Sequence, residues 1–127
     1  METTTKIIFV GVGGALGAVA RYLINISPLA NVSDKFPLPT FVINITGSFL
    51  IGFLFVMFTE RFEISENIRL ALAVGFLGAF TTFSAFELEM FILMRDRQVF
   101  TAFAYLALSV LTGFVGVLAG VALGRRI

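Results

Sequence analysis

The sequence lacks three residue types that carry much of the side-chain chemistry of proteins. Its 127 residues include no cysteine, no histidine and no tryptophan. Without thiolate or imidazole groups the chain offers no zinc site of the usual kind, no cysteine nucleophile and no histidine general base. It also contains no G-x-x-x-x-G-K-[ST] loop for binding ATP. We therefore expect that the protein is not an enzyme.

Charged residues are scarce as well. Only 13% of the residues are charged and 58% are hydrophobic, whereas a soluble domain has about 25% and about 45–50%. A soluble fold of this size could not bury the excess, so the natural solvent is a lipid bilayer. The net charge of +1 argues against a nucleic-acid partner, which needs clustered Lys and Arg.

Four apolar stretches are long enough to cross a bilayer, which takes about 20 helical residues. They cover roughly residues 7–26, 40–59, 68–94 and 99–123, by the apolar-run criterion. All three prolines lie between the first two stretches, where they end or precede a helix. The sequence thus predicts one all-α, multi-pass domain over residues 1–127, placed in the cell's inner (plasma) membrane.

The orientation of the spans is left open by the charges near their ends. With four spans, the N-terminus, the second loop and the C-terminus share one side, which holds five Lys or Arg residues against three or four on the other. The side richer in Lys and Arg is usually cytoplasmic, but this bias is weak. It fits an ordinary protein with its N-terminus inside, and also a chain that inserts both ways and pairs antiparallel.

Small and polar residues form stripes at a spacing of three or four, which lets membrane helices approach closely. The stripes comprise Gly13, Gly17, Arg21 and Asn25 in the first span, Thr40, Asn44, Gly47, Ser48 and Gly52 in the second, and Tyr105, Ser109, Gly113, Gly116, Gly120 and Gly124 in the fourth. Asn44 must meet a partner helix or a solvated path, because an unpaired amide in hydrocarbon costs several kcal/mol. Arg21 either extends to the interface or lines an electropositive vestibule.

The third span contains a polar segment, residues 78–86, that predicts a break in the helix at mid-membrane. Glycine and paired threonines weaken a helix, and freed backbone groups at that depth must be buried in protein or line a cavity. Freed carbonyls suit Na⁺, whereas hydroxyl and N–H groups suit an anion. Phe83 and Phe86 share a face, and their positive ring edges can meet an anion or simply pack. Of the two carboxylates that follow, Glu89 is the better candidate for a pore mouth.

Three motifs occur in order along the chain and together resemble the Fluc/CrcB fluoride channel family. They are Gly11-x-Gly13-Gly14-x-x-Gly17-Ala18-x-x-Arg21-Tyr22, Pro39-Thr40-x-x-x-Asn44 and Gly75-Phe76-Leu77-Gly78-x-x-Thr81-Thr82-Phe83-Ser84-x-Phe86. The resemblance implies a dual-topology antiparallel homodimer with two pores, which gives passive and selective fluoride efflux.

The resemblance also implies roles for individual residues. The fluoride pore would use Asn44, Phe83, Phe86, Ser84, Tyr105 and Ser109, and the vestibules would hold Arg21, Thr40 and Glu89. Backbone carbonyls of Gly78 and Thr81 would hold a structural Na⁺ at the centre of the dimer interface. The chain departs from the family pattern at Ala79, Ala85, Glu87 and Gly113, which affects the polar track along the pore and leaves the phenylalanines and Asn44 in place.

Two other functions remain as alternatives. A small dual-topology drug or cation exporter also uses four short helices, but it needs a carboxylate deep in the first span, and residues 7–26 contain none. A non-transporting membrane assembly protein would explain the glycine stripes and would leave the polar segment of the third span unexplained.

Overall fold

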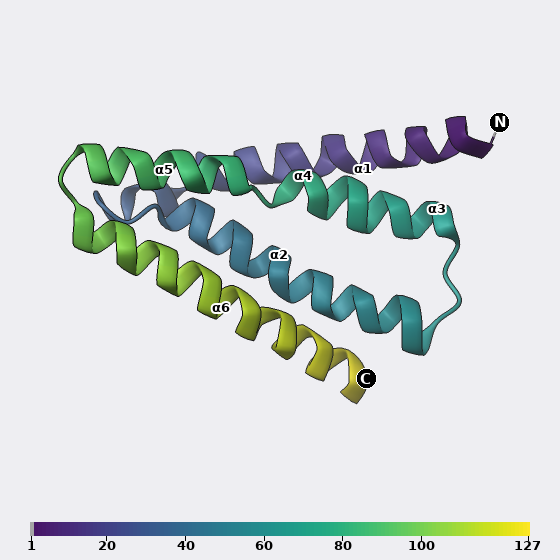
Figure 1. The fold of residues 1–127 in the computed structure, drawn as a ribbon. Coiled ribbons are helices and arrows are strands. Elements are labelled where there is room, and N and C mark those ends of the chain that lie inside the picture. The colour runs from purple at the N-terminus through teal and green to yellow at the C-terminus, as the bar shows by residue number, and fades with distance from the viewer. Residues whose placement is uncertain (1) are drawn as a thin grey trace.

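The structure, a computed structural model, describes residues 2–127, and its regular elements are all helical (Figure 1). Four helical segments are long and apolar enough to cross a membrane: Glu2–Asn31, Leu38–Arg61, Glu66–Arg95 and Val99–Arg126. The prediction of an all-helical chain with four spans is confirmed. The chain is therefore a multi-pass membrane protein.

The four segments are built from shorter elements. In chain order these are α1 (Glu2–Asn25), the 3-10 turn η1 (Pro28–Asn31), α2 (Leu38–Val56), the π-helical η2 (Met57–Arg61), α3 (Glu66–Arg69), the π-helical η3 (Leu70–Leu77), α4 (Gly78–Phe80), α5 (Phe83–Arg95) and α6 (Val99–Arg126). Segment three, from α3 to α5, thus contains two changes of helical geometry and one gap.

The segments pack mainly in two pairs. The helices α2 and α6 lie along each other, and α1 lies along η3 and α4 (Figure 1). Glycines make the second pairing possible, because a Cβ atom at Gly13 or Gly17 would collide with the backbone carbonyl of Ala71 or Phe76. This close backbone approach is how small residues join membrane helices.

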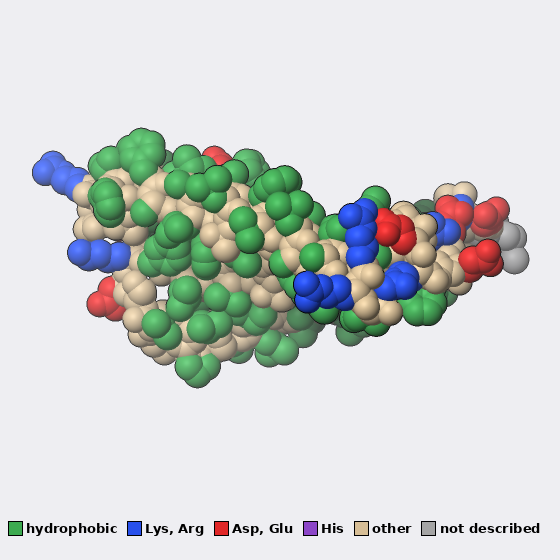
Figure 2. All heavy atoms as spheres, turned by 90° about the horizontal axis from the view of Figure 1, so that it is seen from below, with side chains coloured by type: hydrophobic (Ala, Val, Ile, Leu, Met, Phe, Trp, Pro, Cys, Tyr) green, Lys and Arg blue, Asp and Glu red, His purple; other side chains and the backbone are tan. Residues whose placement is uncertain are grey.

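The surface matches a bilayer environment. Hydrophobic side chains cover most of the face drawn in Figure 2, and Lys, Arg, Asp and Glu gather mainly toward its two ends. Large apolar residues from all four segments are exposed, among them Leu16, Phe55, Phe91 and Phe114. An apolar middle with charged ends is the pattern that lipid selects.

Between α4 and α5 the backbone leaves the helical conformation at Thr81 and Thr82, with ψ angles of 154° and 116°. Both threonine hydroxyls bond to the adjoining helix ends. The Thr81 hydroxyl donates to the Leu77 carbonyl at 2.8 Å, and the Thr82 hydroxyl accepts from the Ala85 N–H at 3.1 Å and caps α5. Gly47 makes room for this gap, since a Cβ there would collide with the Thr81 methyl group.

Candidate functional site

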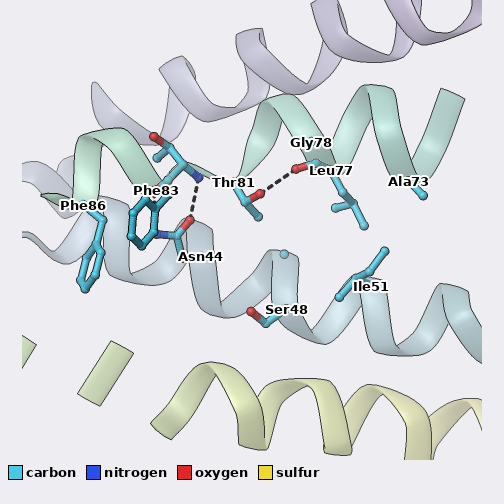
Figure 3. A pocket seen from close by; sticks show the side chains of 11 residues that line it. Asn44, Ser48, Ile51, Ala73, Leu77, Gly78, Thr81, Phe83 and Phe86 are labelled. Carbon is cyan, nitrogen blue, oxygen red and sulfur yellow. Dashed lines mark hydrogen bonds between the residues drawn. The ribbon is translucent and has the colours of Figure 1, made fainter. Parts of the chain in front are cut away.

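A cavity of about 390 Å³ lies between α2 and segment three, beside the gap (Figure 3). Its walls combine polar groups, small residues and two aromatic rings. They are formed by Asn44, Gly47, Ser48, Ile51, Ala73, Leu77, Gly78, Thr81, Thr82, Phe83 and Phe86. No Lys or Arg is among them, so an anion in this cavity would have to be held by dipoles and hydrogen-bond donors.

Asn44 bonds to both backbone groups of Thr82. Its Nδ2 donates to the Thr82 carbonyl at 3.1 Å, and the Thr82 N–H donates to its Oδ1 at 2.9 Å (Figure 3). The partner that the amide required is therefore the unwound backbone of another segment. An amide nitrogen carries two hydrogens, so one N–H of Asn44 remains for a ligand in the cavity.

Arg21 reaches the same gap from α1. Its Nε donates to the Ala79 carbonyl at 2.9 Å, which α4 leaves free because it ends one residue later. A cation at a helix C-terminus is favourable because it faces the negative end of the helix dipole. The guanidinium, expected at a vestibule or the interface, lies at the end of α4, where it stabilises the free carbonyl of Ala79.

The two phenylalanines occupy different environments. Their ring centroids are 6.1 Å apart, but Phe83 is 74% exposed and Phe86 only 5%. Phe86 packs edge-on against Tyr105 at a centroid distance of 4.9 Å. Packing within the chain therefore explains the position of Phe86, whereas Phe83 projects from the first turn of α5 without a covering neighbour.

Glu89 joins three helices through two hydroxyl groups. The Thr40 hydroxyl of α2 donates to Glu89 Oε2 and the Tyr105 hydroxyl of α6 donates to Glu89 Oε1, both at 2.9 Å. Thr40 and Tyr105 are almost fully buried, whereas Glu87 is exposed. The family resemblance assigns Thr40 and Glu89 to the vestibules and Tyr105 to the pore, and it does not predict that the three side chains bond to one another.

Ser84 and Ser109, the two serines among the predicted pore residues, lie in different surroundings. Ser84 is exposed near the gap, with its hydroxyl 3.5 Å from that of Thr82. The Ser109 hydroxyl on α6 is buried and makes no hydrogen bond within residues 2–127. An unpaired buried hydroxyl is costly, so Ser109 is free to bind an ion or a water molecule.

The carbonyls of Gly78 and Thr81, predicted to hold Na⁺, lose the donors that a continuous helix would supply. The Thr82 N–H bonds to Asn44 and the Ala85 N–H bonds to the Thr82 hydroxyl. Freed carbonyl oxygens suit a hard cation. Within residues 2–127, no cluster of three His, Cys, Asp or Glu residues could hold a metal through side chains.

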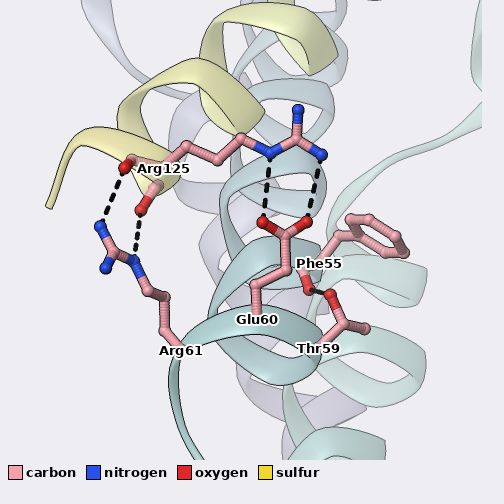
Figure 4. A network of polar contacts seen from close by, with 6 residues as sticks. Phe55, Thr59, Glu60, Arg61 and Arg125 are labelled. Atoms are coloured by element: carbon pink, nitrogen blue, oxygen red, sulfur yellow. Dashed lines mark hydrogen bonds and ion pairs between the residues drawn. The ribbon is translucent and has the colours of Figure 1, made fainter.

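A second polar network lies at the far end of α2 and α6 (Figure 4). Arg125 contacts both carboxylate oxygens of Glu60, at 3.2 and 3.1 Å. Arg61 donates to the carbonyls of Gly124 and Arg125 at 3.1 and 2.9 Å. These contacts cap the C-terminus of α6 and fasten it to η2, away from the cavity.

Ser48 also lines the cavity, one helical turn after Asn44. The sequence places it in a stripe of small and polar residues and does not distinguish it from a packing residue. The spacing of four between Asn44 and Ser48 places both residues one helical turn apart on α2.

The model of the family described as "CrcB-like protein, Camphor Resistance (CrcB)" matches residues 8–121. The chain belongs to the CrcB-like family. Within it, the chain is 45% identical over 122 residues to the Fluoride-specific ion channel FluC of Hahella chejuensis, covering 95% of each chain. Proteins of the same name from Rhizobium meliloti and Ignicoccus hospitalis are 43% identical over 119 residues and 44% over 121. These alignments cover 94% and 95% of this chain, and 95% and 96% of the two relatives.

Proposed function

We propose that the protein is a fluoride-selective channel that gives passive fluoride efflux through the inner membrane. The observation that carries this proposal is the similarity, over nearly the whole chain, to proteins named Fluoride-specific ion channel FluC. Ion channels are not enzymes, in agreement with the expectation from the missing catalytic groups. Fluoride enters acidified cells as neutral HF and is trapped as the anion, so a selective leak would release it along the membrane potential.

The cavity beside the gap supports a route for the ion. A selectivity filter must replace the water shell of an ion with protein groups. One donor in the cavity wall is the free N–H of Asn44, and the unpaired hydroxyl of Ser109 on α6 is a further donor outside that wall. Phe83 and Phe86 line the same cavity and can offer positive ring edges. In this proposal Tyr105 and Ser84 continue the pore, and Thr40 and Glu89 lie toward its vestibules. Arg21, for which the resemblance implies a vestibule position, bonds to the Ala79 carbonyl beside the gap.

The functional unit in this proposal is an antiparallel homodimer of chains with opposite orientation, in which the gap of segment three lies at mid-membrane. The exposed ring of Phe83 supports it, because a second copy would cover this ring and could share it between two pores. The weak charge bias between the two sides of the chain is compatible with insertion in both orientations. A closed pair of this kind uses the same surface on both subunits.

We further propose that the dimer holds one structural Na⁺ through the carbonyls of Gly78 and Thr81 from both subunits. The support is that the usual N–H partners of these carbonyls are bonded elsewhere. Bound there, Na⁺ would neutralise carbonyl dipoles that face one another across the interface.

Purified protein in liposomes tests the function. Fluoride-loaded vesicles should release fluoride when a potassium ionophore removes the opposing potential, and chloride-loaded vesicles should retain chloride. Silence with pure protein would overturn the channel proposal and favour an assembly protein. Drug transport that depends on a proton gradient would instead favour an exporter.

A further inference from the structure

The contact between α2 and α6, called the α2–α6 seam from here on, contains polar residues at intervals of one helical turn. Ser48 lies opposite Gly113, since a Cβ on Gly113 would lie 3.5 Å from the Ser48 hydroxyl oxygen. The two helices run in the same direction (Figure 1). Moving back one turn, by four residues on each helix, therefore places Asn44 opposite Ser109.

One further turn back, the offset pairs Thr40 with Tyr105. These two residues do share a partner, because both donate to Glu89, which confirms the register independently. Polar groups therefore occur at three consecutive levels of the seam. Beyond Ser48 the series ends, because Gly52 lies against the backbone of Val117.

The Ser48 hydroxyl makes no hydrogen bond within the part of the chain that the structure describes. Its residue is half-buried and lines the cavity. In apolar surroundings a hydroxyl without a partner is costly, and serine in a helix usually bonds a carbonyl of the preceding turn. The Ser48 hydroxyl has no such carbonyl partner, so its O–H donor is available to a ligand in the cavity.

Packing alone does not account for the oxygen atom. The Cβ of Ser48 lies 3.6 Å from the position that a Cβ on Gly116 would take, which places the Cβ in the contact between α2 and α6. Alanine would keep that contact. The hydroxyl adds a donor at the level of Gly113, where α6 contributes no side chain.

We propose that Ser48 is a further ion-coordinating residue, whose hydroxyl donates to the permeating anion at the third polar level of the α2–α6 seam. The inference rests on the proposed channel function and adds a residue that neither the sequence motifs nor the family comparison assigns. Ser48 then takes over the anion one helical turn beyond Asn44 and Ser109.

Fluoride efflux from liposomes tests Ser48 with two matched variants. Ser48→Ala should lower the flux roughly tenfold, since a hydrogen bond to a charged group is lost. Thr46→Ala, which removes an exposed hydroxyl from the same helix, should conduct like the wild type. Wild-type flux in S48A overturns the inference and leaves the channel function intact, whereas a silent wild-type protein overturns the channel function itself.

A rescue variant separates ion coordination from packing. A Cβ on Gly113 has no neighbour closer than the Ser48 oxygen, so Gly113→Ser fits and can place a hydroxyl in the same space. The double variant S48A/G113S should recover most of the fluoride flux. If its flux stays as low as that of S48A while both proteins elute like the wild type, the inference is wrong.

Ser48→Cys provides a second measurement if S48A does not fold. The thiol fills the space of the hydroxyl and is a weak donor, so flux should again fall. Flux equal to that of the wild type would overturn the inference.

Discussion

Asn44 and Thr82 exchange two hydrogen bonds, at 3.1 and 2.9 Å, between α2 and the unwound backbone of segment three. The amide therefore provides the donor and the acceptor that a continuous helix would have supplied to Thr82. The same side chain holds the gap and keeps one N–H for the cavity, so deleting it would disturb the gap and the proposed pore together.

Asn44→Asp should abolish most of the fluoride flux. The carboxylate keeps the acceptor for the Thr82 N–H but faces the Thr82 carbonyl without a donor, and it adds a negative charge beside the proposed anion path. We expect a loss of at least roughly tenfold, measured as fluoride efflux from liposomes. Asn31→Asp, at an exposed position, is the control, and equal flux in N44D and N31D would remove Asn44 from the path.

Phe83→Ile and Phe86→Ile should both suppress fluoride flux, but only the second should weaken packing within one chain. Phe86 is buried against Tyr105, so F86I should lower the unfolding free energy of the chain by about 1 kcal/mol. Phe83 is exposed within one chain, so F83I should affect packing only where the proposed dimer covers the ring. Efflux and thermal unfolding in detergent measure the two effects.

The exposed Phe100 provides a control for both phenylalanines, since Phe100→Ile should change neither quantity. Unaltered flux in both F83I and F86I would show that the rings are not part of the conduction mechanism.

Arg21→Gln should destabilise the fold. The variant loses the charged donor that binds the Ala79 carbonyl at the end of α4, an interaction worth about 1 kcal/mol. Its thermal unfolding should therefore occur at a lower temperature than that of Arg97→Gln, which removes an exposed arginine in the turn before α6. If the two variants unfold at the same temperature, the Arg21 contact contributes nothing to stability.

Gly17→Ala should weaken the pairing of α1 with η3. The added Cβ collides with the Phe76 carbonyl, and the backbone of neither helix can move aside without cost. We therefore expect the unfolding free energy to fall by about 1–3 kcal/mol. Gly11→Ala is the matched control on the same helix, because a Cβ there meets nothing within 4 Å. Denaturation of both variants in detergent measures the difference, and equal stability would contradict the close approach.

The sequence indicates which residues are unusual and leaves their partners unknown. Asn44 and the paired threonines could be recognised because polar groups are costly in an apolar stretch. That Asn44 would bond to Thr82, or that Glu89 would join Thr40 and Tyr105, depends on the register of helices far apart in the chain. Hydrophobic periodicity fixes which face of a helix is polar, but it does not fix this register.

The sequence also does not predict which of the two phenylalanines is exposed. Spacing alone gives Phe83 and Phe86 one common face, yet one ring is exposed and the other buried. The difference arises because Phe83 occupies the first turn after the gap, while Phe86 reaches Tyr105 on α6. No pattern in residues 70–77 signals the π-helical geometry of η3 either, and this stretch packs along α1, which is far away in the sequence.

The gap in segment three has a consequence for the order of assembly. The Ala79 carbonyl accepts a hydrogen bond from Arg21 of α1, and the Thr82 N–H donates one to Asn44 of α2. Segment three alone has neither partner, and in lipid it would satisfy its own backbone most cheaply by remaining helical throughout. We therefore expect the gap to form only when segment three meets the first two segments, so that segment three alone would not provide the proposed ion path.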